Sequence, residues 1–470
     1  MNPSPTAPSP AMSMLRSAGW GGKALLVFLL ALLMSVPGLF VYGLVAEREH
    51  RANGVMAEVS NLRGGPQTLV GPLLIAPWSA PSSDGKSVVN GWYIVSPREG
   101  SVDLTVKSST LHRGIFDVPV YDAGARIKAS FDPPPLSVAA PGGGRIDWSR
   151  AVFVLAFTDL RGARQDVAAN FNAGAGGAVL EFIPTSTMDI GGPAANGPDG
   201  QPVSASFGLV TASAAPFIAA GKGGVLTASL EFTGAQRLAV APFARSTRVN
   251  AASAWTSPSF DGAFLPRDRA VGKAGFTAAW SVPFLARGLS DQGTSQALSL
   301  NALNAKAVGV TFAVANNPYA SVERALKYGV MFIGLVFLTF FVFEALSGQR
   351  VHAAQYVLIG LAQMIFYLLL LSLSEYVGFD IAFAGAAMAT VGLISLYAGW
   401  ALGSRTYRLR ALIVFSLLYA LIYALMRLED FALLAGSLAS FIGLAAAMYL
   451  TRNLNWYAAT RPSAAPTPTA

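Results

Sequence analysis

The sequence predicts a membrane protein of mixed α and β structure: six transmembrane helices, one N-terminal and five C-terminal, with a large β-rich domain between the first and the second. Three observations indicate this fold. Of the 470 residues, 53% are hydrophobic and only 12% are charged, whereas soluble domains average about 25% charged residues. The longest apolar stretches gather in two zones, 24–45 and 328–451. Between these zones, many of the 47 Gly and 28 Pro residues interrupt short alternating runs, a pattern typical of β-sheets.

The first zone, residues 24–45, contains no charged residue. At about 1.5 Å per residue, a helix of this length spans the roughly 30 Å hydrocarbon core of a bilayer. The apolar stretch is too long for a usual signal peptide and no A-x-A site follows it, so we interpret it as an uncleaved signal anchor rather than a cleaved signal peptide. Pro37-Gly38 is expected to bend this helix. Residues 1–23 before it are predicted to be disordered.

The second zone divides at charges and turn residues into five predicted spans. The fourth span is short, and the side chains of Arg410 and Arg427 are expected to extend outward from its ends. Residues 452–470 after the last span are predicted to form a disordered tail. The five spans are 328–346, 353–374, 381–404, 411–426 and 431–451.

Basic residues in the short loops predict the orientation. If the N-terminus is cytoplasmic, all short cytoplasmic segments together hold eight Lys and Arg residues and no acid, as the positive-inside rule expects. These eight residues account for the whole net charge of +8, so the basic balance indicates membrane topology and not a nucleic-acid partner. They are Arg16, Lys23, Arg350, Arg405, Arg408, Arg410, Arg452 and Arg461.

The segment 46–327 then lies on the periplasmic side. Its alternating runs predict an antiparallel β-sandwich or roll. Two helical stalks are expected: 47–62, with Val55, Val59 and Leu62 on one face, and a helix that starts at Asn317-Pro318 and continues directly into the second span. The Gly-, Ala- and Pro-rich stretch 172–202 predicts hairpin turns rather than a phosphate-binding loop, because it lacks the G-x-G-x-x-G spacing.

No catalytic, cofactor or metal centre is predicted. The chain has no Cys, which excludes disulfides, thiolate metal sites and Cys nucleophiles, and its three His residues are far apart in the sequence. It also lacks the G-x-S-x-G, H-E-x-x-H and Walker A motifs. We therefore predict a protein that is not an enzyme, although a Ser–Lys hydrolase stays open.

Glu344 is the clearest ionisable residue inside a predicted span, where charge is expensive. One interpretation is a proton or ligand site. The interpretation that we favour is an interfacial ion pair with Arg350 or Arg405 that holds two helices together.

Several long segments resemble the CreD family of inner-membrane proteins, and they occur in the order found in that family. The resemblance covers about residues 45–450. It implies a location in the inner membrane of a Gram-negative bacterium, a role in cell-envelope integrity, stress response and colicin tolerance, and control by a two-component system. It supplies no catalytic residues. The segments are GGPQTLVGPLLIAPW (64–78), HRGIFDVPVYDA (112–123), FTDLRGA (157–163), TSPSFDGAFLP (256–266), GFTAAWSVPFLAR (275–287), ERALKYGVMFIGLVFLTFFVFE (323–344) and VHAAQYVLIGLAQMIFYLLLLSLSEYVGFDIAF (351–383).

The same segments suggest where the outer domain is coupled to the membrane helices. Glu323, Arg324 and Lys327 lie where the domain is expected to meet the membrane, and Glu344 and Glu375 bracket the two best-matching spans. These five residues are the candidate coupling positions.

The favoured function is that of an envelope protein anchored in the lipid bilayer, whose periplasmic domain binds a protein or glycan. A YidC-type insertase shares the arrangement of one span, a β domain and five further spans, but it would need a buried basic residue within the spans, and none is evident. A membrane-tethered hydrolase lacks a supporting motif. The ligand, the direct partners and the oligomeric state are left open.

Overall fold

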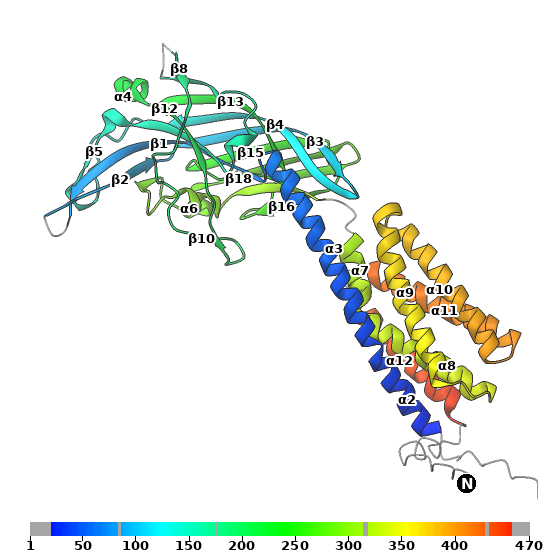
Figure 1. The fold of residues 1–470 in the computed structure, drawn as a ribbon. Helices are drawn as coiled ribbons and strands as arrows, with labels where there is room; N and C mark the ends of the chain where they lie inside the picture. The colour runs from blue at the N-terminus through cyan, green and yellow to red at the C-terminus, as the bar shows by residue number, and fades with distance from the viewer. Residues whose placement is uncertain (1–19, 83–85, 174–176, 314–317, 428–431, 454–470) are drawn as a thin grey trace, which may run out of the picture. The chain divides into compact units, whose positions relative to one another are not determined.

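The computed structural model describes residues 20–82, 86–173, 177–313, 318–427 and 432–453 (Figure 1). Contacts divide the chain into two compact units. The helical unit contains Met1–Arg51 and Asn316–Ala470, and the β unit contains Ala52–Ala315.

Most of the two predicted disordered tails lies outside the described residues. Residues 20–23 do not belong to such a tail, because helix α2 (Trp20–Leu33) begins at Trp20. Lys23, which the sequence placed in a flexible flank, is therefore part of a helix.

The described part of the chain contains six helices that are long and apolar enough to cross a membrane, one N-terminal and five C-terminal, as predicted. The N-terminal one is formed by α2 together with α3 (Ser35–Leu62), which continues into the β unit. The other helices of the helical unit are α7 (Pro318–Lys327), α8 (Gly329–Ser347), α9 (Ala353–Val377), α10 (Phe379–Ala401), α11 (Arg405–Arg427) and α12 (Ala432–Thr451).

The N-terminal helix is interrupted at Met34, between α2 and α3. Pro37 explains the interruption, because a proline lacks the N–H that would bond to the carbonyl one turn earlier. The disturbance predicted for Pro37-Gly38 therefore lies about one turn on the N-terminal side of the proline.

Two predicted helix boundaries were wrong. Helix α11 has 23 residues and starts at Arg405, so the arginines assigned to a loop before a short span form its first turns. The second stalk does not continue directly into the membrane, because α7 ends at Lys327 and α8 begins at Gly329. Asn317, the predicted N-cap of that stalk, lies outside the described residues.

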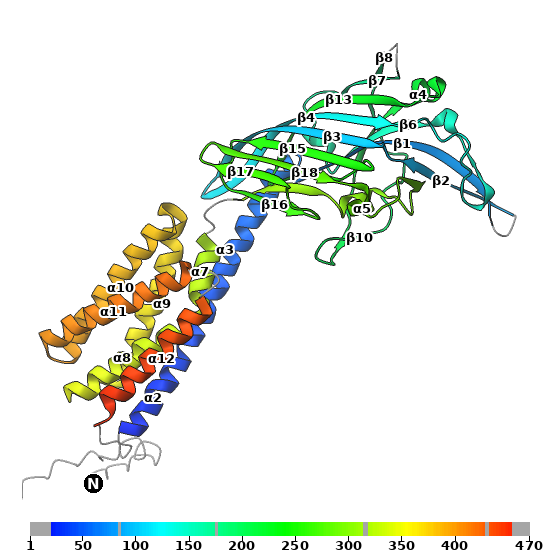
Figure 2. The same ribbon diagram turned by 180° about the vertical axis from the view of Figure 1, so that it is seen from behind.

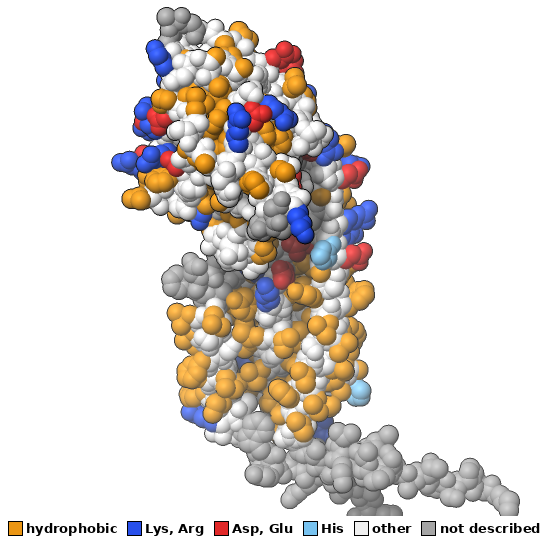
Figure 3. Space-filling model, turned by 90° about the vertical axis from the view of Figure 1, so that its left-hand side faces the viewer, with side chains coloured by type: hydrophobic (Ala, Val, Ile, Leu, Met, Phe, Trp, Pro, Cys, Tyr) orange, Lys and Arg blue, Asp and Glu red, His pale blue; other side chains and the backbone are white. Residues whose placement is uncertain are grey.

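Aromatic side chains form the centre of the helical unit. The ring of Tyr419 on α11 packs edge-to-face on Phe332 of α8 and on Phe366 of α9, each with ring centroids 4.9 Å apart. Outward-facing side chains are largely hydrophobic, as one face of the unit shows in Figure 3. Such a surface suits lipid rather than water.

Two sheets and a small hairpin make up the β unit (Figure 2). The eight-stranded sheet has the order β17-β18-β15-β3-β4-β13-β7-β8. The ten-stranded sheet has the order β16-β20-β14-β1-β6-β12-β9, with β2 and β5 also paired to β1 and with β19 paired to β2. The strands are β1 (Gln67–Pro81), β2 (Val88–Val95), β3 (Glu99–Arg113), β4 (Phe116–Phe131), β5 (Arg145–Ile146), β6 (Val152–Phe157), β7 (Ala168–Asn172), β8 (Gly177–Glu181), β9 (Ile183–Thr185), β10 (Ala195–Asn196), β11 (Pro202–Val203), β12 (Gly208–Ser213), β13 (Gly224–Ala235), β14 (Arg237–Val240), β15 (Ser246–Ser253), β16 (Pro258–Gly262), β17 (Asp268–Gly272), β18 (Gly275–Val282), β19 (Gln292–Thr294) and β20 (Val308–Phe312).

The sheets are mixed, which corrects the prediction of a purely antiparallel arrangement. Most neighbouring strands are antiparallel, but β1 pairs with β14 and β3 pairs with β15 in parallel. Parallel neighbours require a long connection, and each of these pairs is separated by more than a hundred residues of chain.

The two sheets pack face to face through an aromatic cluster. Phe153 of β6, in the ten-stranded sheet, contacts Phe131 of β4 and Phe171 of β7, in the eight-stranded sheet, with ring centroids 5.2 and 5.7 Å apart. Phe217 of helix α4 (Ala215–Ala220) closes the cluster at 5.3 Å from Phe171. This packing is that of a sandwich, as predicted.

The C-terminal part of α3 packs within the β unit. Val55, Met56 and Val59 contact a buried patch that includes Val118 and Val120 of β4. Leu62, predicted to share their face, is 78% exposed. It is the last residue of the helix, and Met56 contributes to the contact instead.

In the Gly-, Ala- and Pro-rich stretch, β10 and β11 form a hairpin, as predicted. Strands β7 and β8 also pair, and the predicted turn between them, residues 174–176, lies outside the described residues. Gly200 in the β10–β11 turn has φ of +77°, a conformation that favours glycine.

Candidate functional site: two buried carboxylates

Glu344 lies near the C-terminal end of α8, and its side chain is 0% exposed. After Ser347, Gly348 adopts a left-handed conformation and ends the helix. The loop that follows brings the backbone N–H of Val351 to 2.8 Å from Oε1 of Glu344. The carboxylate therefore accepts a hydrogen bond from the loop that connects α8 to α9.

The side chains of Lys23 and Tyr356 also bond to Glu344. Together with Val351, these residues form what we call the Glu344 cluster. The ammonium group of Lys23 forms an ion pair with Oε1 of Glu344 and donates a hydrogen bond to the carbonyl of Val351 at 2.8 Å. The hydroxyl of Tyr356 donates to Oε2 of Glu344 at 2.8 Å. Both carboxylate oxygens are thus bonded, as a buried charge requires.

The partner of Glu344 differs from the one expected. The sequence suggested Arg350 or Arg405, but the structure pairs Glu344 with Lys23, 321 residues away in the chain. Sequence reasoning missed Lys23 because it treated this residue as a topology charge, and it missed Tyr356 because no local spacing links it to Glu344.

Glu375 is the second buried carboxylate, with a side chain 7% exposed near the C-terminal end of α9. The hydroxyl of Tyr319 on α7 donates to its Oε1 at 3.0 Å, and Nη1 of Arg48 on α3 lies 3.8 Å from its Oε2. Burial, together with the bond to Glu375, raises the pKa of Tyr319, so its hydroxyl stays a donor. These three residues form the Glu375 cluster, which joins α3, α7 and α9.

The other candidate residues lie along α7. Glu323 and Lys327 form an ion pair of 3.2 Å one turn apart, and the hydroxyl of Tyr42 donates to Glu323 at 3.4 Å. Nη2 of Arg324 donates to the hydroxyl of Ser321 at 3.4 Å. The side chains of Lys327 and Glu323 are 61% and 29% exposed, so this pair contributes little to stability.

The five candidate residues therefore fall into two places. Glu323, Arg324 and Lys327 share α7 with Tyr319, which binds Glu375. Glu344 lies at the opposite end of α8 from α7, and the 15 residue steps from Gly329 to Glu344 correspond to roughly 22 Å of helix. The structure does not bring Glu344 and Glu375 into contact.

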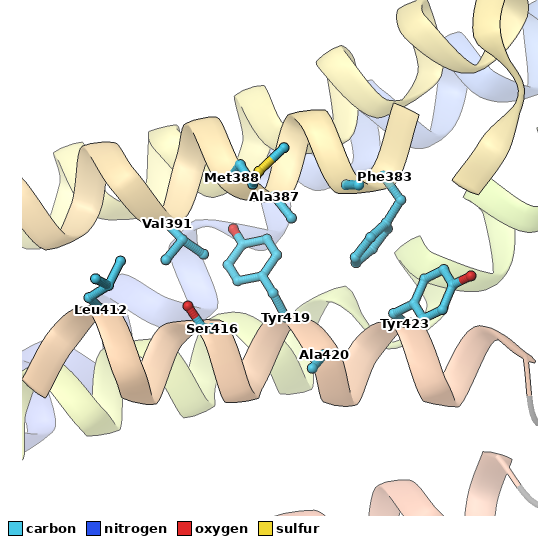
Figure 4. Close-up of a pocket in the computed structure, with 10 residues that line it drawn as sticks. Phe383, Ala387, Met388, Val391, Leu412, Ser416, Tyr419, Ala420 and Tyr423 are labelled. Atoms are coloured by element: carbon cyan, nitrogen blue, oxygen red, sulfur yellow. The ribbon is translucent and has the colours of Figure 1, made fainter. Parts of the chain in front are cut away.

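A groove of about 430 Å³ lies between α10 and α11 (Figure 4). Its lining is mostly apolar, and the hydroxyl of Tyr419 points from α11 toward α10. Tyr423 lies at one end and donates to Asp380 at 3.0 Å. The groove brings together no pair of acidic or basic groups suited to proton transfer in catalysis.

In the β unit, the charged residues of the recognised segments are engaged in holding the fold. Arg287, which is 0% exposed, donates hydrogen bonds to four backbone carbonyls and to the hydroxyl of Ser96. Burial lowers its pKa to about 10, which leaves it charged near neutral pH. Asp261 accepts a hydrogen bond from Nε of Arg237 at 2.9 Å, and Asp159 accepts one from the backbone N–H of Arg161 at 2.9 Å.

A polar hollow of about 860 Å³ lies on the eight-stranded sheet. Arg98, Lys128 and Asp132 supply charged groups, and Arg98 forms an ion pair of 3.2 Å with Asp132. Asn170 and Asn172 of β7 supply amide groups on the same lining. Side chains of this kind hydrogen-bond to hydroxyl, amide and carboxylate groups of a ligand. Among the described residues, no group of three or more His, Asp and Glu side chains could hold a metal ion.

Comparison with known proteins identifies the family. The sequence model of the family "Inner membrane protein CreD" matches residues 20–457. The chain is also 30% identical over 446 residues to the inner membrane protein CreD of Escherichia coli (strain K12), covering 92% of each chain. Together with the six apolar helices, these matches show that the chain is a multi-pass inner-membrane protein that belongs to the CreD family.

Proposed function

We propose that this protein maintains the integrity of the bacterial envelope as a non-enzymatic component, with the β unit in the periplasm and both termini in the cytoplasm. The β unit binds an envelope ligand or protein, and helix α3 transmits that event to the membrane helices. The orientation rests on the eight basic residues of the short loops that the sequence places in the cytoplasm.

The observation that carries the proposal is that α3 is anchored in each of the two units. In the β unit, Val59 is buried against Val118 and Val120, and Glu58 forms an ion pair of 2.9 Å with Arg113. In the helical unit, Arg48 lies 3.8 Å from the buried Glu375. Both anchors belong to the same helix, 11 residue steps or roughly 16 Å apart between Arg48 and Val59.

The polar hollow on the eight-stranded sheet is the binding site that we assign to the envelope ligand. Its mixture of two cations, one carboxylate and two amides suits a glycan or peptide with hydroxyl, amide and carboxylate groups. In the recognised segments, the charged groups of Asp261, Asp159 and Arg113 are already paired within the fold, so we assign no catalytic role to them.

An insertase is the less favoured function. Its groove would need a free basic residue inside the membrane, and Lys23 is paired with Glu344. No other observation supports that activity.

Complementation of a deletion strain of the native host tests the proposal. Asn53 is exposed on α3, so Asn53→Pro breaks the helix without removing a packed side chain, while Asn53→Ala preserves it as the matched control. We expect the deletion to increase sensitivity to detergent with EDTA and to release periplasmic enzymes. Wild type and Asn53→Ala should restore the barrier, and Asn53→Pro should not, at equal protein level in the membrane.

The outcomes separate the parts of the proposal. A deletion strain with an intact barrier would refute the envelope function. Full restoration by Asn53→Pro would leave that function standing but refute transmission through α3.

A further inference from the structure

The interior of the helical unit contains polar side chains that the proposed function does not use. Tyr356, Gln363 and Tyr367 on α9 are 1%, 0% and 0% exposed, respectively. Their spacing of seven and four residues places them on one face of the helix. We call these three residues the polar track.

Several hydrogen-bonding atoms along this track lack a partner among the described residues. Both amide atoms of Gln363 and the hydroxyl of Tyr367 are unpaired. Burying such groups without a hydrogen bond costs several kcal/mol in an apolar medium. Ordered water commonly satisfies groups of this kind, because each water bonds to two to four polar atoms.

The track reaches a different structural feature at each end. At one end, the hydroxyl of Tyr356 donates to Glu344. At the other end, the hydroxyl of Tyr367 lies beside Gly329, where a Cβ atom would be 3.4 Å from it. Gly329 is the first residue of α8, just after the break that separates α8 from α7. The 11 residue steps from Tyr356 to Tyr367 correspond to roughly 16 Å of α9. The features at its two ends, Glu344 and Gly329, lie about 22 Å apart along α8, compared with roughly 30 Å for the hydrocarbon core.

We propose that the polar track holds a chain of water molecules and conducts protons across the membrane, between Glu344 and the break that separates α7 from α8. Each water accepts a proton from one neighbour and gives a proton to the next, so every water keeps its number of protons. The hydrogen bonds are reversed by one transfer, and the waters turn back before the next one. The tyrosine hydroxyls both donate and accept, and Gln363 orients water through its donor Nε2 and its acceptor Oε1.

The chemistry of the track favours protons over other ions. None of its three side chains is charged, and the aromatic rings of Phe337 and Phe340 pack on Tyr356, with centroids 5.7 and 5.4 Å apart. A metal cation would need several oxygen ligands in place of its hydration shell, whereas a proton needs only a continuous line of hydrogen bonds. This inference is independent of the envelope function.

Proton flux into vesicles tests the inference. The full-length protein is reconstituted into liposomes that contain a pH-sensitive dye, and a potassium gradient with valinomycin sets the membrane potential. We expect flux above that of protein-free vesicles for wild type and its loss in Gln363→Leu and Tyr367→Phe. Tyr449→Phe is the matched control, because Tyr449 is 63% exposed on α12, and it should conduct like wild type. Wild-type flux no greater than that of protein-free vesicles would overturn the proposal, as would unchanged flux in both track variants.

A measurement on the wild type avoids dependence on the folding of variants. Radicals generated from water by X-rays label side chains beside bound water. We expect labelling of Tyr367 but not of Phe415, which is 0% exposed in an apolar part of the same unit. If Tyr367 is as unreactive as Phe415, the track is dry and the proposal is wrong.

Discussion

Replacing Lys23 with methionine isolates the buried charge of Glu344. Methionine has an unbranched side chain like that of lysine but carries no charge. The carboxylate of Glu344, which is 0% exposed, then loses its cation. Removing one partner of a buried ion pair costs about 3–5 kcal/mol. Val351 and Tyr356 still donate hydrogen bonds to Glu344, and Lys23 itself is 25% exposed. We therefore expect the free energy of unfolding to fall by about 3 kcal/mol, the lower end of that range.

A substitution of the other partner, Glu344, should destabilise the protein less. Glu344→Gln keeps an acceptor for Val351 or Tyr356, and the remaining Lys23 ammonium can move toward water or lipid headgroups. We expect a loss of about 1–2 kcal/mol. The double variant should lose less than the sum of the single variants, because it leaves no uncompensated charge.

Thermal and denaturant unfolding in one detergent, followed by circular dichroism, measures these differences. Arg427→Met is the matched control, since Arg427 pairs with Asp380 and both side chains are more than half exposed. The control should lose less than about 1 kcal/mol. A loss in Lys23→Met no larger than in Arg427→Met would refute the reasoning.

Three further predictions concern the β unit. Arg287→Met leaves four buried carbonyls without their donor and should lower the free energy of unfolding by about 3 kcal/mol or more, measured by urea denaturation followed by tryptophan fluorescence. Gly234→Ala places a Cβ atom 2.2 Å from the buried hydroxyl of Tyr121 and should cost about 1–3 kcal/mol, whereas Gly124→Ala, which meets no atom within 4 Å, should cost much less in the same denaturation experiment. Hydrogen bonds from Arg161 lower the pKa of Asp159 below its ordinary value of 3.8, so its stabilisation is complete above that pH and is lost as the pH falls through the lower folded-state pKa. Asp159→Asn should flatten this acid-side loss in unfolding measured against pH, and an unchanged profile would contradict the assignment.

Recognising the membrane spans required only local information. A helix needs about 20 consecutive apolar residues to cross a hydrocarbon core of about 30 Å, and such a stretch can be recognised from the sequence alone. Charges served less well as boundaries, since Arg405, Arg408 and Arg410 lie inside the first turns of α11. Long arginine side chains can leave the apolar region while their backbone stays helical.

The strand content of the β unit was also evident from alternating runs, but the order of the strands was not. The neighbours β3 and β15 are separated by the chain that forms β4 to β14, and their parallel pairing follows from how the whole sandwich closes. The alternation of apolar and polar residues along a strand indicates which of its faces is buried. It does not indicate which strand is its neighbour in the sheet.

For the candidate site too, some features could be predicted from the sequence and others could not. The sequence by itself identified Glu344 as a costly charge inside a span and Glu375 at a span end, because hydrophobic surroundings make single acidic residues conspicuous. Only the tertiary structure decided that Lys23 and Tyr356 bond to Glu344, that Arg48 and Tyr319 lie at Glu375, and that Gln363 and Tyr367 share a buried face without partners. Ion pairs and hydrogen bonds act over a few ångströms in space, and helix packing, not sequence separation, determines which groups come within that range.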